Sequence, residues 1–228
     1  MKHWNASVAE HNQLLLPDRI KLDLCFDPAL LQRDLERLQG DEWIAHFVTQ
    51  NYAGDWSVIP LRGMAHATHP VMMIYSDPAC TEFADTPFLD RTPYFREVLE
   101  TFQCPLTSVR LMKLSPGSRI KAHRDHDLSV EAGTARLHIP IVTNEQVKFV
   151  LNGERVVLNE GECWYLRLSD LHSVENNGIT ERVHLVVDAV VVGYAGWWVM
   201  PGSRIWTQKS PEPVKIQGFM FLLDHLRF

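Results

Sequence analysis

The chain has 228 residues, which is long enough for one well-buried domain, and all-β barrels of this size commonly remain single domains. Its net charge of −6, with Lys and Arg scattered along the sequence, argues against a nucleic-acid partner. Residues 1–13 contain no apolar core of signal-peptide type and no stretch approaches ~18 uninterrupted apolar residues, so we expect a cytoplasmic protein without a membrane partner.

The first part of the chain predicts a strand, a helix and a second strand. Residues Ile20–Phe26 alternate between polar and apolar side chains, which is typical of a half-buried strand. Asp27 and Pro28 then suit the cap and the first position of a helix that stops at Gly40. Its apolar residues recur at helical spacing: Leu30, Leu31, Leu35 and Leu38. The aromatic-rich segment Trp43–Met64 fits one strand with a flanking loop.

A long loop and a second helix follow. The segment His66–Asp90 carries several prolines and little periodicity, which indicates a surface loop of a length that often serves as a functional lid. Thr92 and Pro93 predict a capped helix that runs through Phe102. We expect residues 1–104 to support the core that comes after them.

After Pro105 the apolar pattern changes to period two, and six strands are predicted: Ser108–Leu114, Arg136–Val142, Val147–Leu151, Arg155–Leu158, Cys163–Leu168 and Arg182–Val192. Asn152-Gly153 is a type I′ hairpin signal, and Ser115-Pro116-Gly117 is another turn. The pattern favours a mainly β (α+β) fold with a double-stranded β-helix core, a jelly-roll or cupin-like barrel with flanking helices. We place this core at residues 105–195 of a single domain, 1–228, and expect the tail 196–228, with its apolar run Phe219–Leu223, to pack a last helix against the barrel.

Two histidines and one carboxylate form a candidate metal centre. His123 and Asp125 are two residues apart, so their side chains point to the same face of a strand, and His172 follows downstream. This ligand set suits non-haem Fe(II) with open coordination positions. The competing ligands are His126, which would lie on the opposite strand face, and His184, which sits among valines. The cysteines form no C-x-x-C pair and indicate neither a zinc knuckle nor a disulfide framework: Cys25, Cys80, Cys104 and Cys163.

Three arginines are candidates for contact with a carboxylate. Arg182 follows the turn signal Asn176-Asn177-Gly178, and if that turn joins an antiparallel pair, Arg182 lies opposite His172 and beside the metal. Arg110 and Arg136 lie on apolar strands, where an inward arginine is costly unless paired, so we favour a carboxylate contact over a salt bridge at the barrel rim. Two further residues are candidates for substrate contact, with core packing or a surface pair as equal alternatives: Trp56 and Arg62.

Several segments carry a resemblance to a known family: His123-Arg124-Asp125, the strand Arg136–Pro140, the hairpin at Asn152-Gly153, the segment Gly161–Leu166, and His172 with Arg182-Val183-His184-Leu185. They resemble the aspartyl/asparaginyl β-hydroxylase family over about Trp43–Val192. Within that family the chain resembles the bacterial enzymes that hydroxylate free proline, which have the same Gly-Asp-Trp-Ser-Val-Ile-Pro run.

The resemblance implies an Fe(II)- and 2-oxoglutarate-dependent oxygenase that consumes O₂, with ascorbate as a supporting reductant. It implies that the iron is held by His123, Asp125 and His172. Arg182 matches the arginine that binds the distal carboxylate of 2-oxoglutarate. Two further residues match positions near this cosubstrate: Arg136 and His138.

Three functions remain open at this point. In the leading one, the protein hydroxylates a C–H bond of a free, proline-like amino acid or an amino-acid-derived small molecule, with no catalytic side chain beyond the metal centre. In the second, the substrate is an Asp or Asn residue of a peptide or protein. The third is a non-catalytic metal-binding cupin, which would have no need for Arg182 beside its site. The carboxylate of Asp125 favours hydroxylation over the halogenation that related oxygenases support when this ligand is missing.

Overall fold

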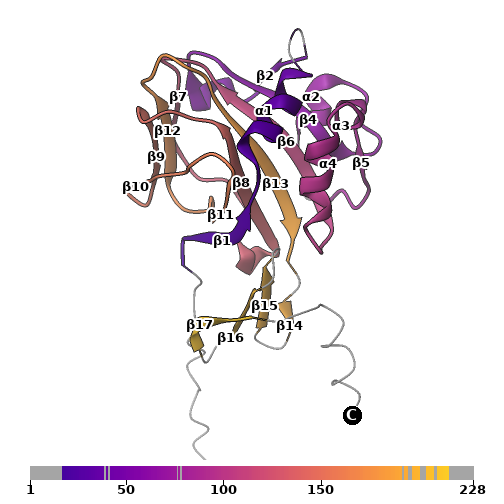
Figure 1. Ribbon diagram of the computed structural model, residues 1–228, viewed down its shortest axis with the longest axis vertical. Coiled ribbons are helices and arrows are strands. Elements are labelled where there is room, and N and C mark those ends of the chain that lie inside the picture. Colours follow the sequence, from indigo (N-terminus) through magenta and orange to yellow (C-terminus); the bar gives the residue numbers. More distant parts are fainter. Residues whose placement is uncertain are drawn as a thin grey trace, which may run out of the picture.

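Two antiparallel sheets face each other in the computed structural model, which describes residues 17–215 except Gln39, Asp41, Ser76, Pro78, Val192, 195–196, 201–203 and 208–209 (Figure 1). The larger sheet has the order β1-β11-β8-β13-β6-β4-β2, with β5 paired to β4. Its strands are β1 (Arg19–Cys25), β2 (Ile44–Ala45), β4 (Trp56–Met64), β5 (Phe83–Asp85), β6 (Leu106–Leu114), β8 (Thr134–Val142), β11 (Glu162–Leu166) and β13 (Arg182–Val190). The smaller sheet has the order β10-β9-β12-β7-β3, and its strands are β3 (Tyr52–Ala53), β7 (Arg119–His123), β9 (Val147–Leu151), β10 (Glu154–Val156) and β12 (His172–Asn176).

The path of the chain between the sheets makes this a double-stranded β-helix. From β6 to β13 the strands alternate: β6, β8, β11 and β13 belong to the larger sheet, and β7, the β9–β10 hairpin and β12 belong to the smaller one. The predicted jelly-roll core is therefore confirmed, and each predicted strand after Pro105 is present with ends that differ by a few residues. The inner faces of the two sheets enclose the interior of the barrel, with Phe149, Val174 and Met112 in its apolar part.

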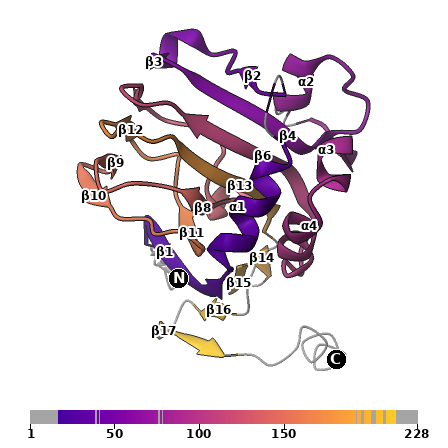
Figure 2. The same ribbon diagram turned by 45° about the horizontal axis from the view of Figure 1, so that its top comes forward.

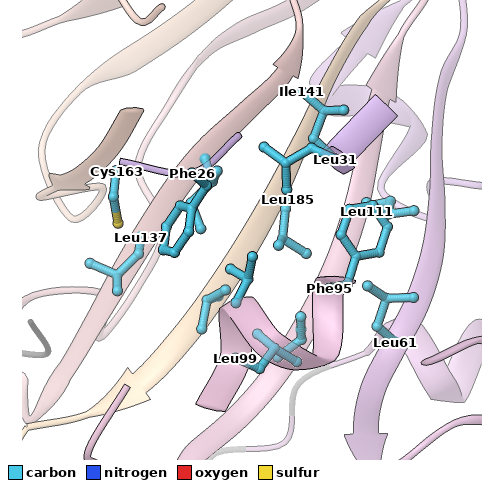
Figure 3. Packing of buried hydrophobic residues seen from close by; sticks show 14 of the residues in the cluster. Phe26, Leu31, Leu61, Phe95, Leu99, Leu111, Leu137, Ile141, Cys163 and Leu185 are labelled. Atoms are coloured by element: carbon cyan, nitrogen blue, oxygen red, sulfur yellow. The ribbon is translucent and has the colours of Figure 1, made fainter. Parts of the chain in front are cut away.

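Three helices cover the outer face of the larger sheet: α1 (Pro28–Glu36), α3 (Pro87–Asp90) and α4 (Pro93–Glu100) (Figure 2). Leu31 of α1 and Phe95 of α4 are fully buried against this sheet, where Figure 3 shows them beside Leu111 and Leu185. This packing leaves the opposite face of the sheet, inside the barrel, free to carry polar side chains.

The two predicted helices are both present, but their caps differ. Asp27 caps α1 as expected, because its carboxylate accepts from the backbone N–H groups of Ala29 and Leu30. The prediction that Thr92 caps α4 in the same way is wrong, since the Thr92 hydroxyl donates to carbonyls of the preceding turn. The fully buried carboxylate of Asp34, from α1, instead accepts from the N–H groups at the start of α4. The start of α4 is thus capped by a side chain from a distant helix and not by the residue that precedes it.

Two segments contain more regular structure than the sequence predicts. The region Trp43–Met64 forms β2, β3, β4 and the 3₁₀ helix η1 (Thr49–Asn51) instead of one strand. The expected loop His66–Asp90 contains the short helix α2 (Pro70–Ile74), strand β5 and helix α3. A further 3₁₀ helix, η2, spans Val130–Ala132. Elements this short have too few residues for a clear period, so pattern analysis treats them as loop.

Two of the predicted turns are present, but one strand pairing inferred from a turn signal is wrong. Asn152 and Gly153 both have positive φ, 52° and 82°, as a type I′ turn requires, and join β9 to β10. The turn at Ser115-Pro116-Gly117 is closed by a hydrogen bond from Ser118 N–H to Ser115 C=O. The signal Asn176-Asn177-Gly178, however, does not join an antiparallel pair, because β12 lies in the smaller sheet and β13 in the larger one. Arg182 therefore pairs with Leu114 of β6 and is not opposite His172.

The chain after Val190 forms a separate four-stranded sheet where it is described. Its strands are β14 (Gly193–Tyr194), β15 (Trp197–Met200), β16 (Arg204–Thr207) and β17 (Ser210–Lys215). The described part of the tail is thus strand, and the run Phe219–Leu223, expected to lie in a last helix, falls outside the described residues. Among the helices described, none has the length and apolarity needed to cross a membrane.

Candidate metal centre

His123, Asp125 and His172 meet at one end of the barrel. One ligand atom from each lies within 4.8 Å of the others, and they are the only such group of His, Cys, Asp and Glu in the described part of the chain. His123 ends β7 and His172 begins β12, and the two strands place these residues opposite each other. Asp125 lies just past the end of β7, where its backbone N–H donates to the Leu168 carbonyl. The three side chains converge, as the sequence predicts.

Both histidines present the same nitrogen to the centre. Nδ1 of His123 lies 2.7 Å from the Lys121 carbonyl, and Nδ1 of His172 lies 3.0 Å from the Asp170 carbonyl. A carbonyl only accepts, so each Nδ1 carries the hydrogen and each Nε2 keeps its lone pair for a metal. These backbone partners come from the residue two positions earlier in each case. Two imidazoles with fixed tautomers and one carboxylate are a donor set that fits Fe(II) with open positions.

A network of buried charges holds the carboxylate ligand. Arg136 donates to Asp188 through Nε and Nη2, at 2.6 and 2.8 Å, and to Asp125 through Nη1 at 3.0 Å. Nη1 of Arg110 lies 3.5 Å from Oδ2 of Asp188, the oxygen that also accepts from Nη2 of Arg136. Burial alone would raise the pKa of Asp125, but its contact with His123 and the nearby charge of Arg136 bring that pKa well below its usual range. Asp125 is therefore charged and oriented.

The centre opens into a cavity of about 430 Å³ between the two sheets. The ionisable side chains in its wall include the three candidate ligands and five others: Arg110, Arg136, His138, Arg182 and Asp188. Phe149 and Val174 contribute apolar surface deeper in the barrel. The cavity thus combines a metal-type donor set with several fixed positive charges.

Arg182 differs from Arg110 and Arg136, the other buried arginines of the cavity, because it has no carboxylate partner within the described residues. It is 2% exposed, and burial lowers the pKa of its guanidinium to about 9. Its Nη2 group contacts Nδ1 of His184 at 2.8 Å, while its buried Nε has no hydrogen-bond partner among the residues that the structure describes. A buried guanidinium with an unused donor is suited to a carboxylate that enters the cavity with a ligand.

Of the two remaining sequence candidates, Trp56 lines the cavity and Arg62 does not. Trp56 lines the cavity and stacks on His46 with ring centroids 3.6 Å apart. Its buried indole N–H has no partner in the described part of the chain. Arg62 does not line the cavity; its guanidinium binds Asp85 at 2.6 Å and the carbonyls of Phe83 and Leu106. We therefore leave Arg62 out of the site, because its donors are already used in holding β5 to β4.

The two competing candidates for metal ligands lie outside the cluster. His126 has an exposed side chain and belongs to no group of three possible ligands among the described residues. His184 is 1% exposed and hydrogen-bonded within the barrel. Neither joins the cluster of His123, Asp125 and His172.

Comparison with known proteins agrees with the resemblance seen in the sequence. A sequence profile described as aspartyl/asparaginyl beta-hydroxylase matches residues 28–191, which include every residue of the cluster. The chain belongs to the aspartyl/asparaginyl β-hydroxylase family. An L-proline cis-4-hydroxylase of Rhizobium meliloti (strain 1021) is 27% identical over 166 residues, which are 72% of this chain and 57% of that protein. The chain thus spans little more than half the length of this relative.

Solved structures of similar fold include an oxidoreductase of the 2OG-Fe(II) oxygenase family from Burkholderia pseudomallei. It has a TM-score of 0.48 at 15% identity and covers 76% of this chain and 85% of its own. A prolyl-4-hydroxylase of Pseudomonas putida has a TM-score of 0.45 at 11% identity, with 77% and 94% covered.

Sequence reasoning missed two residues of this member of the aspartyl/asparaginyl β-hydroxylase family. Asp188 was hidden in the apolar run that became β13, although a carboxylate at an inward position of a buried strand signals a partner of opposite charge. His46 lies in an aromatic-rich segment and lines the cavity. Burial, together with the charge of Arg110, lowers the pKa of His46 to about 4, so this imidazole is neutral.

Proposed function

We propose that this protein is an Fe(II)- and 2-oxoglutarate-dependent oxygenase that hydroxylates a C–H bond of a free amino acid, with proline or a close relative as the first candidate. One observation supports this proposal above the others. A two-histidine, one-carboxylate cluster shares a cavity with Arg182, a fully buried guanidinium without a carboxylate partner in the described chain.

In this proposal His123, Asp125 and His172 hold the metal through two Nε2 lone pairs and one carboxylate oxygen. When bound, Fe(II) supplies the chemistry by which O₂ converts 2-oxoglutarate to succinate and CO₂ and one oxygen atom enters a substrate C–H bond. Arg136 keeps the Asp125 carboxylate charged and fixed in direction, since its Nη1 donates to one carboxylate oxygen while its other groups bind Asp188. The chain's own part would therefore be to supply these three ligand atoms to the ion.

The proposed role of Arg182 is to bind the distal carboxylate of 2-oxoglutarate. The cosubstrate has two carboxylates, and one must lie away from the metal when the other is near it. Arg182 lines the same cavity and has an unused Nε–H, so it can form a charge-assisted hydrogen bond there. The positions of Arg136 and His138 in the cavity wall support the expectation that both lie near the cosubstrate.

Substrate recognition is proposed at the part of the cavity lined by Arg110 and Trp56. An amino acid needs a cation near its carboxylate and an apolar surface near its side chain. Arg110 is 4% exposed in the cavity wall, and the Trp56 indole offers both an aromatic face and a buried N–H. The relative from Rhizobium meliloti, at 27% identity, is an L-proline cis-4-hydroxylase, which supports a proline-like substrate.

Two other functions are kept as outcomes of the test. An Asp or Asn residue of a peptide is the substrate that the family description suggests. A non-catalytic cupin would bind metal in the same cluster but would have no use for Arg182, so we place it last. We also propose a cytoplasmic location, which the four free cysteines support because thiols persist in reducing compartments.

The experiment is a product analysis by mass spectrometry with Fe(II), ascorbate and 2-oxoglutarate. A panel of free L-amino acids that includes proline is compared with a short peptide that contains Asp and Asn. We expect succinate to form with a free amino acid that gains one oxygen atom. Turnover on the peptide alone would assign the protein-residue function, and iron binding without any 2-oxoglutarate consumption would assign the cupin.

A further inference from the structure

The guanidinium of Arg182 forms a hydrogen bond with His184, a residue of the same strand. Arg182 and His184 are two residues apart on β13, so their side chains share the inner face of the barrel. Nη2 of Arg182 lies 2.8 Å from Nδ1 of His184, and the two residues are 2% and 1% exposed. A contact this short between such deeply buried groups fixes the direction of the guanidinium.

The positions of the hydrogens follow from the chemistry of the two groups. An arginine only donates, so Nδ1 of His184 accepts and carries no hydrogen. Burial, with the charge of Arg182, lowers the pKa of His184 well below its usual range, so the ring is neutral and its hydrogen is on Nε2. Nδ1 of His138 lies 3.3 Å from the same acceptor and must therefore carry a hydrogen of its own. Arg182 and His138 thus both donate to the unprotonated Nδ1 of His184.

The lining of two separate cavities shows on which side of Arg182 this contact lies. Arg182 lines both the cavity of the metal centre and a second cavity of about 650 Å³ at the other end of β9. His184 lines only the second cavity, and His138 lines only the first. His184 therefore contacts the guanidinium from the side of the second cavity, while Arg182 also borders the cavity of the metal centre and its Nε has no hydrogen-bond partner among the described residues.

We propose that His184 is a positioning residue that orients Arg182 for the distal carboxylate of 2-oxoglutarate, an inference that rests on the proposed function. A neutral acceptor is the group this task needs. An Asp or Glu at this position would neutralise the guanidinium and compete with the cosubstrate, and a lysine would repel it. An apolar residue would leave a second buried N–H without a partner and the guanidinium without a fixed direction.

The test compares His184→Asn with His184→Leu, two side chains of nearly the same shape. The Asn oxygen can occupy the place of Nδ1 and accept from Arg182, whereas Leu has no acceptor. Calorimetry measures the binding of 2-oxoglutarate to the Mn(II)-loaded protein, which does not depend on turnover. We expect the Leu variant to bind about tenfold more weakly than wild type and the Asn variant to stay within about threefold. In turnover assays the same difference should appear in the 2-oxoglutarate KM rather than in kcat.

Equal binding by the Leu and Asn variants would overturn the positioning role, provided that wild type binds 2-oxoglutarate and Arg182→Leu weakens it. No binding by wild type would instead overturn the proposed function. If the Leu variant does not fold, nitrogen NMR of isotope-labelled histidine in the wild-type protein decides the matter. A hydrogen on Nε2 of His184 and on Nδ1 of His138 is expected, and a hydrogen on Nδ1 of His184 would contradict the contact with Arg182.

Discussion

The buried carboxylate of Asp188 should be among the residues that contribute most to the stability of this protein. It is 3% exposed and accepts two hydrogen bonds from Arg136, at 2.6 and 2.8 Å, with Arg110 3.5 Å away. The substitution Asp188→Asn keeps the shape of the side chain but removes its charge. Arg136 would then keep only Asp125 as a charged partner, and both guanidiniums would remain buried.

The structure gives a magnitude for this change. Removing one partner from a buried ion pair costs about 3–5 kcal/mol, because the charge left behind cannot return to water. The matched control is Asp85→Asn, whose carboxylate binds Arg62 and Arg96 with its side chain 35% exposed. Exposed pairs of this kind contribute about 0.2–1 kcal/mol, since water and salt screen them. The same chemical change should therefore differ several-fold in its effect at the two positions.

Thermal unfolding followed by circular dichroism measures the difference. For a chain of this size 1 kcal/mol shifts Tm by roughly 2–4 °C, so Asp188→Asn should lower Tm by roughly 6–20 °C and Asp85→Asn by no more than roughly 4 °C. An Asp188→Asn protein that melts within 2 °C or so of the Asp85→Asn protein would refute the account of the buried network.

Three further predictions concern the cosubstrate, the carboxylate ligand and a turn. Arg182→Leu should cost ~2–4 kcal/mol in 2-oxoglutarate binding and raise its KM well over tenfold with iron binding intact, and an unchanged KM would reduce Arg182 to a structural residue. Asp125→Ala should weaken turnover less completely than loss of a histidine ligand, because water or chloride can take the open position, and product analysis that found full hydroxylation would remove Asp125 from the ligand set. Gly161→Ala should destabilise the fold more than Gly117→Ala, since both have positive φ but only at Gly161 would a Cβ lie 2.2 Å from the carbonyl oxygen of Phe26. Urea unfolding of the two variants checks this, and equal midpoints would contradict it.

The sequence predicted the parts of this fold that depend on local chemistry. The type I′ turn at Asn152-Gly153, the Asp27 cap and the strands after Pro105 follow from backbone preference and period-two burial. His123 and Asp125 also converge, as their two-residue spacing predicts, although Asp125 lies just past the end of β7. These features need only neighbours in the chain, so a single sequence is enough to find them.

Features that join distant parts of the chain could not be predicted in the same way. A turn signal shows where the chain reverses but not which strand it then pairs with, so Arg182 was expected opposite His172 and instead lies in the other sheet. The contact between Arg136 and Asp188 joins residues 52 positions apart, and the cap that Asp34 provides for α4 joins residues 60 apart. Only the fold brings these charges to their partners.

Fe(II) binding distinguishes the residues of the cluster from a histidine that lies outside it. Wild type, His172→Ala and His126→Ala are dialysed anaerobically against Fe(II), and bound iron is measured with the consumption of 2-oxoglutarate in parallel. The cluster predicts one iron per chain in wild type and in His126→Ala, whose side chain is exposed and outside the cluster, and loss of both binding and turnover in His172→Ala. A His172→Ala protein that binds iron and consumes 2-oxoglutarate like wild type would contradict the assignment of the metal centre.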